Sequence, residues 1–155
     1  MNKDKTTGTL NAVLKEAKPE DIQKYLAENE AYFAEDDRPF ASYFREILRI
    51  KKLRQQEVFL RADISERYGY KLISEEKHTV RRDVILRLCL GAHLNIRETN
   101  RALQFYGMAP LYPRVARDAV LIIAVNTERF EIEDVDELLK EHGMEPLYAV
   151  RPAEE

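Results

Sequence analysis

Glycine and proline are scarce in this chain, with five glycines and six prolines among 155 residues. Because these residue types interrupt helices most strongly, their scarcity favours long segments of helix-forming residues. The single cysteine, Cys89, excludes an internal disulfide, and a reducing cytoplasm is its natural setting. No apolar run reaches the length of a membrane span, and no basic-then-apolar signal stands at the start. We therefore expect a cytoplasmic protein with no membrane partner.

The charge of the chain is distributed unevenly along its length. Apolar residues make up 45% and charged residues 34%, with a net charge of −3. Residues 38–82 hold twelve basic and six acidic side chains, whereas the segments before and after this block are acidic. Since local charge steers association with polyanions, this basic block is where we expect an anionic partner. The alternative is that such blocks arise by chance in a highly charged helical protein.

Apolar positions recur at helical spacing in segments separated by turn signals. Residues 1–18 are polar and predicted to be loosely ordered, and Pro19 opens a helix with an apolar stripe that extends to Phe33. Ser65 and Thr79 are predicted to cap two of the helices that follow. Those later helices are predicted over residues 40–52, 55–62, 66–74 and 80–94.

An internal repeat is the sharpest pattern in the sequence. The Gly-Met-x-Pro-Leu-Tyr element at 107–112 recurs at 143–148, and the Arg-Asp pair at 82–83 recurs at 117–118. Glycine suits the left-handed end of a helix, and the following proline prevents its continuation. Asn95 and Glu98 have the spacing of a capping box. The pattern predicts two stacked helical hairpins, over residues 79–113 and 114–148.

Residues 55–74, QQEVFLRADISERYGYKLIS, combine a short helix, a tight turn and a second short helix. With the flanking predicted helices, this segment resembles the phage-repressor-like (XRE, Cro-like) helix-turn-helix family. It is most similar to a divergent bacterial branch with Tyr68-x-Tyr70 in the recognition helix, an Arg-Asp pair opening the next helix, and Gly-x-x-Pro-Leu-Tyr elements after it. The resemblance covers roughly residues 40–148.

The resemblance implies an all-α protein whose helix-turn-helix core is extended by two tandem helical hairpins. The expected organisation is an acidic N-terminal helical segment over 1–38, the helix-turn-helix domain over 39–94, a C-terminal hairpin extension over 95–149 and a disordered tail over 150–155. It also implies a transcriptional regulator that binds double-stranded DNA as a homodimer, through the second helix of the pair in the major groove. The C-terminal hairpins are the expected surface for the dimer or for another protein partner.

The residues that would contact DNA follow from the same resemblance. Side chains at the start of the second helix would read base edges, with Arg67 suited to guanine and Glu66 to cytosine. The remaining side chains would anchor phosphates. The base-reading set is Glu66, Arg67, Tyr70 and Lys71, and the backbone-anchoring set is Gln55, Gln56, Lys77, His78, Arg81 and Arg82.

Three positions depart from the common pattern of that family. Asp63 stands where a glycine is frequent in the turn, a geometry that Asp tolerates. Phe59 stands where a small residue is common, and Gly69 where an aliphatic one is common. We interpret Phe59 and Gly69 as a compensating exchange of volume. Acidic Glu66, Glu75 and Glu76 near the reading helix favour the alternative that the module is a non-DNA-binding adaptor that regulates a protein partner.

No residue pattern points to catalysis, a metal or a cofactor. The three histidines, His78, His93 and His142, lie far apart in the sequence without ligand spacing. Cys89 stands among leucines and isoleucine, which favours a core position over a nucleophile. The acidic run of residues 131–137 begins a predicted helix and is interpreted as a solvated face. We expect a binding protein that is not an enzyme.

Overall fold

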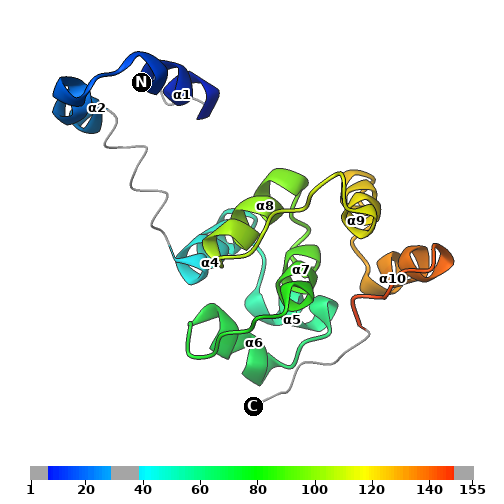
Figure 1. Ribbon diagram of the computed structural model, residues 1–155. Coiled ribbons are helices and arrows are strands. Elements are labelled where there is room, and N and C mark those ends of the chain that lie inside the picture. Colours follow the sequence, from blue (N-terminus) through cyan, green and yellow to red (C-terminus); the bar gives the residue numbers. More distant parts are fainter. Residues whose placement is uncertain (1–6, 29–38, 149–155) are drawn as a thin grey trace. The chain divides into compact units, whose positions relative to one another are not determined.

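The structure is a computed structural model that describes residues 7–28 and 39–148. All regular structure in these two ranges is helical, which confirms the predicted all-α class (Figure 1). The chain divides into two compact units, Met1–Asp37 and Arg38–Glu155. Phe33 and the predicted tail over 150–155 lie outside the described residues. No helix in the described ranges has both the length and the apolar character that crossing a bilayer requires.

In residues 7–28, the described part of the first unit, there are two short helices and one 3-10 turn. They are α1 (Thr7–Glu16), η1 (Pro19–Asp21) and α2 (Ile22–Glu28). The prediction of a loosely ordered start was wrong for residues 7–16, because Leu10, Val13 and Leu14 recur at helical spacing within a run of otherwise helix-compatible residues. The predicted start at Pro19 is confirmed as a helical turn, and the Asp21 carboxylate accepts the Lys18 N–H at 2.9 Å.

The second unit contains every helix predicted from residue 40 onward. The described helices are α4 (Phe40–Ile50), α5 (Gln55–Ala62), α6 (Glu66–Ile73), α7 (Arg82–Gly91), α8 (Ile96–Phe105), α9 (Ala116–Asn126) and α10 (Ile132–Glu141). Helices α4 and α7 end earlier than predicted because Lys52 and His93 have left-handed backbone angles, with φ of 59° and 55°. Thr79 is not the N-cap of α7, which is Arg81; instead the Thr79 hydroxyl accepts the Arg81 N–H at 3.1 Å.

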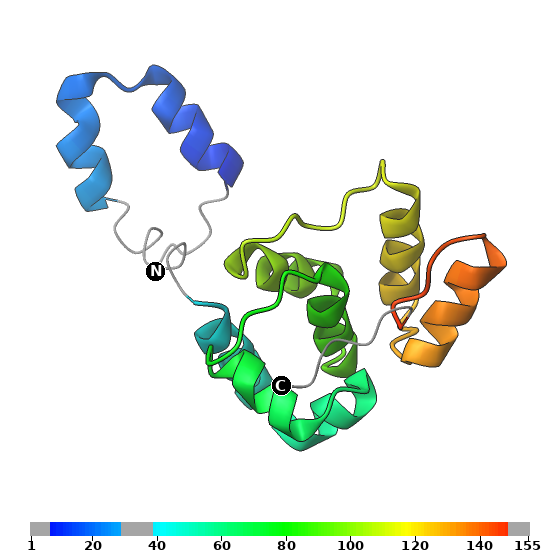
Figure 2. The ribbon, with the colours of Figure 1, turned by 60° about the horizontal axis from the view of Figure 1, so that its bottom comes forward.

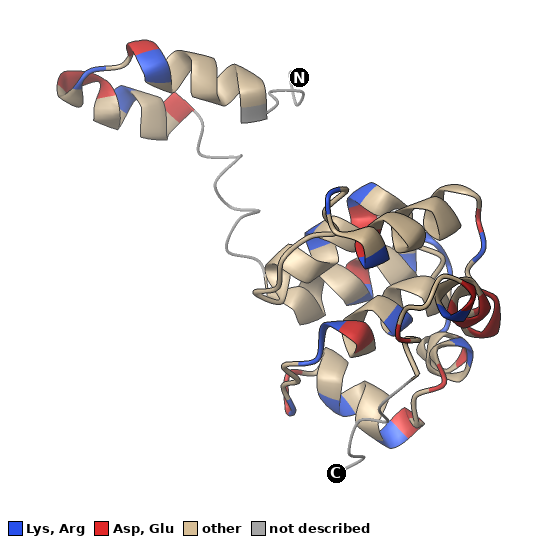
Figure 3. Ribbon diagram, turned by 45° about the vertical axis from the view of Figure 1, so that its right-hand side comes forward, with Lys and Arg blue, Asp and Glu red and all other residues tan. Residues whose placement is uncertain are grey.

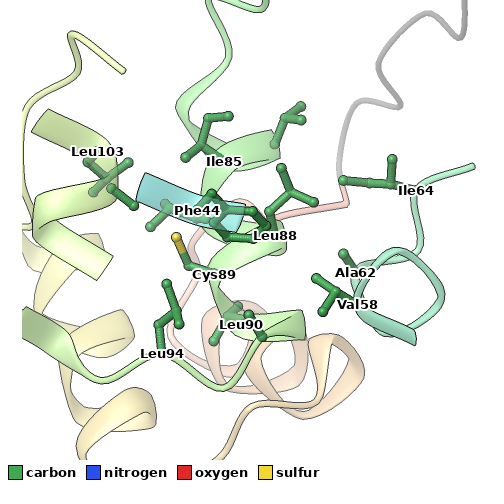
Figure 4. Packing of buried hydrophobic residues seen from close by; sticks show 14 of the residues in the cluster. Phe44, Val58, Ala62, Ile64, Ile85, Leu88, Cys89, Leu90, Leu94 and Leu103 are labelled. Carbon is green, nitrogen blue, oxygen red and sulfur yellow. The ribbon is translucent and has the colours of Figure 1, made fainter. Parts of the chain in front are cut away.

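Helix α7 lies at the centre of the second unit (Figure 2). Every residue from Val84 to Gly91 is buried, and α5, α8 and α10 all pack against this helix. Figure 4 shows Cys89 among the leucines of α7, with Val58 and Ala62 of α5 facing the same core. One hydrophobic cluster runs from Phe40 to Leu147. The helices assigned to residues 39–94 and 95–149 therefore share a single core.

Helices α5 and α7 approach each other closely. A Cβ atom at Gly91 would lie 2.6 Å from the Val58 carbonyl oxygen, so only glycine fits there. The buried Arg87 of α7 donates from Nε to the Ala62 carbonyl at 3.0 Å, and its guanidinium also donates to the Asp63 carbonyl. These bonds satisfy carbonyl groups that the C-terminus of α5 leaves without a helical partner. The end of α5 is thus fixed to the core helix.

The two Arg-Asp pairs of the sequence repeat bind each other crosswise. The Arg82 guanidinium of α7 makes two 2.8 Å hydrogen bonds to the Asp118 carboxylate of α9. The Arg117 guanidinium of α9 makes two 2.9 Å hydrogen bonds to the Asp83 carboxylate of α7. Each bidentate pair is the strongest geometry available between these groups. The pairs therefore hold α7 and α9 together, while α8 packs on α7 and α10 on α9.

Candidate nucleic-acid interface

Helices α5 and α6 are joined by a tight turn at residues 63–65. Asp63 ends α5 in the left-handed conformation, with φ of 55°, as its residue type permits. Ile64 is buried and anchors the turn in the core. Ser65 caps α6 by accepting the Tyr68 N–H on its hydroxyl at 3.2 Å, which confirms the predicted N-cap. The turn thus presents the N-terminus of α6 at the surface.

Helix α6 has one buried face and one exposed face. Tyr68, Gly69, Leu72 and Ile73 are buried, whereas three predicted base-reading residues, Glu66, Arg67 and Tyr70, are exposed and the fourth, Lys71, is half-buried. The Tyr70 ring meets the Phe59 ring edge-on, with centroids 5.0 Å apart. This contact fixes the ring while leaving part of it open to a partner. The four predicted base-reading side chains therefore come from one short helix with a defined outer face.

The first turns of α5 and α6 lie beside each other. The Gln56 amide donates to the Glu66 carboxylate at 3.3 Å, which brings a predicted backbone anchor against a predicted base reader. The neighbouring Gln55 is half-buried. A shallow groove here is lined by Arg54, Gln56, Glu57, Leu60, Ile64, Ser65 and Glu66. Two helix N-termini with amide and guanidinium side chains share this surface.

The segment between α6 and α7 carries the other predicted anchors. The Lys77 side chain is half-buried, and those of His78 and Arg81 are exposed. The His78 ring stacks on the Tyr106 ring, with centroids 4.5 Å apart and planes within 8°. Arg82 differs from these anchors, because its guanidinium is bound to Asp118 and to the carbonyls of Ala109 and Pro110. The charge of Arg82 is therefore balanced inside the protein.

Basic and acidic residues are interspersed along the ribbon of the second unit (Figure 3). Cationic groups come from Arg54, Arg67, Lys71, Lys77 and Arg81, and acidic groups from Glu57, Glu66, Glu75 and Glu76. The acidic residues of α10 form a separate charged stretch that begins with Glu133 and Asp134. A set of guanidinium and ammonium groups beside a helix N-terminus can bind phosphates, and the exposed face of α6 can donate and accept hydrogen bonds.

Tyr106 lies buried beneath this surface, and the sequence did not single it out. Its hydroxyl accepts the Thr79 N–H at 2.8 Å, in addition to the ring contact with His78. Burial of the hydroxyl raises the pKa of Tyr106 above its usual value, and the bond from Thr79 opposes that effect. The sequence repeat offers one signal for Tyr106, because the equivalent position 36 residues later holds a different residue, His142.

Other reactive side chains lie inside the protein or in ordinary packing contacts. Burial raises the pKa of the Cys89 thiol to about 12, in agreement with its predicted core position. The His93 ring stacks on Phe130 with centroids 4.6 Å apart, and its pKa is lowered by burial and by the nearby Arg61 charge. Among residues 7–28 and 39–148, no three His, Cys, Asp or Glu side chains are grouped so that they could hold a metal ion.

Comparison with known proteins finds no matching family model, no similar curated protein and no similar solved structure.

Proposed function

We propose that this protein is a helix-turn-helix transcriptional regulator of the phage-repressor type that binds double-stranded DNA through α6. The observation that carries the proposal is the arrangement of α5 and α6. A left-handed turn at Asp63 and a Ser65 cap place the N-terminus of α6 beside that of α5, with Glu66, Arg67 and Tyr70 exposed together. A helix with a free polar face and a supporting helix behind it fits the major groove.

In this proposal α6 reads bases and its neighbours bind the backbone. Arg67 pairs with a guanine edge, Tyr70 and Lys71 contact adjacent positions, and Glu66 is held by Gln56 for a cytosine amino group. Phosphates are bound by the N-terminus of α5 with Gln55 and Gln56, and by the segment that carries Lys77, His78 and Arg81. Arg82 is left out of this set because Asp118 already binds its guanidinium.

Helices α7 to α10 complete the proposed molecule as two tandem hairpins, α7 with α8 and α9 with α10. A single module of this size makes a small interface with DNA, so two copies on a two-fold site are the proposed binding unit. The exposed acidic residues of α10 suit a protein-facing surface, because their charge repels phosphate. The proposed activity is binding without catalysis and without a cofactor.

Paired alanine substitutions test the proposal. The double variant Arg67→Ala and Lys71→Ala removes two cations from the α6 face. The matched control, Arg129→Ala and Lys140→Ala, removes two exposed cations from the region of α9 and α10. Fluorescence anisotropy with duplex DNA from the upstream region of the protein's own gene should show at least about tenfold weaker binding for the α6 variant, since each good base contact contributes about 1–3 kcal/mol. Equal affinities for both variants would contradict the proposal.

A protein-binding adaptor is the second candidate, and an exposed leucine favours it. Leu60 on the outer face of α5 is 81% exposed. It borders a groove between α5 and α10 whose rim includes Arg61, Glu131 and Tyr148. An apolar centre with a charged rim is the usual composition of a protein-binding surface. The adaptor predicts that Leu60→Asp abolishes regulation in the cell while Arg67→Ala with Lys71→Ala does not, and the DNA-binding proposal predicts the reverse.

A further inference from the structure

The segment between α6 and α7 is fixed to the protein at three points. The Lys77 N–H donates to the Lys71 carbonyl at 3.0 Å, which ties the segment to the last turn of α6. The Thr79 N–H donates to the Tyr106 hydroxyl at 2.8 Å, and the Arg82 guanidinium is bound by Asp118. Two of these three partners lie beyond α7 in the chain. The segment therefore has a shape imposed by the first repeat unit and its connection to α9.

The side chains between these fixed points face outward. Val80 is 90% exposed, so its two methyl groups are open to a partner. His78 and Arg81 are exposed on either side of it, while Thr79 between them is buried. The segment thus presents an imidazole, two methyl groups and a guanidinium in a row.

Tyr106 fixes both the backbone and one side chain of this segment. Its hydroxyl binds the Thr79 N–H, and its ring stacks on the His78 ring at 4.5 Å. The ring is itself held edge-on by Phe40 at 5.0 Å, with an interplanar angle of 89°. Thr79 in turn fixes the backbone at Arg81, because its hydroxyl accepts the Arg81 N–H at 3.1 Å.

The second repeat unit shows that the fold itself does not require a tyrosine at this position. Contacts common to both units are made by equivalent residues: Asn100 accepts the Leu111 N–H, and Asp136 accepts the Leu147 N–H. The position equivalent to Tyr106 is His142, whose exposed ring contacts only a carbonyl of its own helix among the bonds described. The bond from Tyr106 to residue 79 is therefore an addition specific to the first unit.

We propose that Tyr106 is a positioning residue that holds residues 78–81 in one conformation, so that His78, Val80 and Arg81 form a second contact with duplex DNA beside α6. Arg81 and His78 bind phosphate oxygens, and the Val80 methyl groups lie against a deoxyribose. Because the segment is ordered before binding, less conformational entropy is lost when DNA is engaged. This inference rests on the proposed DNA-binding function.

The variant Tyr106→Phe tests the inference because it keeps both ring contacts and removes only the hydroxyl. Tyr112→Phe is the matched control, since that side chain is 53% exposed. Amide hydrogen exchange of the free protein is measured first. Thr79 should exchange about tenfold faster in Tyr106→Phe and be unchanged in Tyr112→Phe, because a buried N–H loses its only described partner. If the Thr79 N–H exchanges at the same rate in Tyr106→Phe as in the unchanged protein, the inference is overturned, while the proposed function is unaffected.

A double-mutant cycle then measures whether Tyr106 acts through the segment. Tyr106→Phe should weaken binding of duplex DNA about five- to tenfold in the otherwise unchanged protein. In a background with His78→Ala, Val80→Ala and Arg81→Ala, the same substitution should have no further effect on affinity. If Tyr106→Phe weakens DNA binding in that background as much as in the unchanged protein, the inference is overturned, because Tyr106 would then act through general stability. Absence of DNA binding by the unchanged protein overturns the proposed function and this contact with it.

Discussion

The ring of Phe59 on α5 occupies the space that a side chain on Gly69 of α6 would need. A Cβ atom at Gly69 would lie 2.5 Å from Cδ1 of Phe59 and 2.6 Å from Cε1. Both residues are buried, and the same ring supports Tyr70 on the outer face of α6. The predicted placement of a large Phe59 opposite a small Gly69 is confirmed. The spacing between the two helices of the proposed DNA-binding pair therefore depends on one large and one absent side chain.

Substitutions at this contact should have effects that depend on each other. Gly69→Ala should lower the free energy of unfolding by about 1–3 kcal/mol, because the added methyl overlaps the ring. In the Phe59→Ala background, which itself costs about 3–5 kcal/mol, Gly69→Ala should be neutral or stabilising, since the space is open and alanine favours the helix. Urea unfolding of the four proteins measures this change of sign. Strictly additive effects would contradict the packing described here.

The crossed ion pairs should contribute unequally to stability. Asp118→Ala should lower the free energy of unfolding by about 2–3 kcal/mol, less than a fully buried pair because the Arg82 side chain is 26% exposed against 5% for Asp118. Asp83→Ala should cost about 1 kcal/mol or less, because the Asp83 side chain is 35% exposed while Arg117 is as exposed as Arg82. Equal losses in chemical denaturation would show that burial does not decide the strength of these bonds.

Protonation of Asp118 in acid should lower the free energy of unfolding. Burial opposes ionisation of this carboxyl, but hydrogen bonds from Arg82 and from the Tyr112 N–H outweigh burial and lower its pKa below the ordinary 3.8. A carboxyl with a depressed pKa in the folded state stabilises the protein fully above its unfolded pKa, and that contribution is lost as pH falls below about 4 towards the folded pKa. Urea unfolding between pH 2.5 and 6 should therefore show a smaller acid loss in Asp118→Asn than in the unchanged protein. A loss of equal size in both would assign the acid sensitivity to other carboxyls.

Cys89 should be unreactive while the protein is folded. Its side chain is 1% exposed, and burial raises the pKa of its thiol to about 12, so little thiolate forms near neutral pH. Reaction with a chromogenic disulfide reagent at pH 8 should be at least about a hundredfold slower than in denaturant, at a rate set by transient opening. Rapid labelling of the folded protein would show that the core around α7 opens far more readily than its packing implies.

Local signals in the sequence located the helix pair well. The bounds of α5, the Ser65 cap and the Asn95–Glu98 capping box depend on residues within one turn of each other, and the structure has all three. Helix ends at Lys52 and His93 were placed too late, because non-glycine residues there adopt left-handed angles that only glycine would have signalled.

The long-range contacts of the site could not be derived in the same way. Arg82 has the residue type and position of a phosphate anchor, but its partner Asp118 is 36 residues away, and only folding brings the two together. Tyr106 is also distant from the segment it holds, at 27 residues from Thr79. Sequence periodicity reports which face of a helix is apolar and does not report which distant group a guanidinium or hydroxyl will meet.

Binding of the purified protein to duplex DNA across a salt series is the most direct test of the proposed function. With Lys77 and Arg81 at phosphates, the logarithm of the binding constant should fall linearly with the logarithm of salt concentration, with a slope of about −2 per bound chain. Arg81→Ala should reduce that slope by about one, and Arg129→Ala, at an exposed position outside this surface, should leave it unchanged. Affinity for one sequence should also exceed that for random duplex. No detectable binding at low salt, or binding without sequence preference and without a salt slope, would contradict a DNA-binding role.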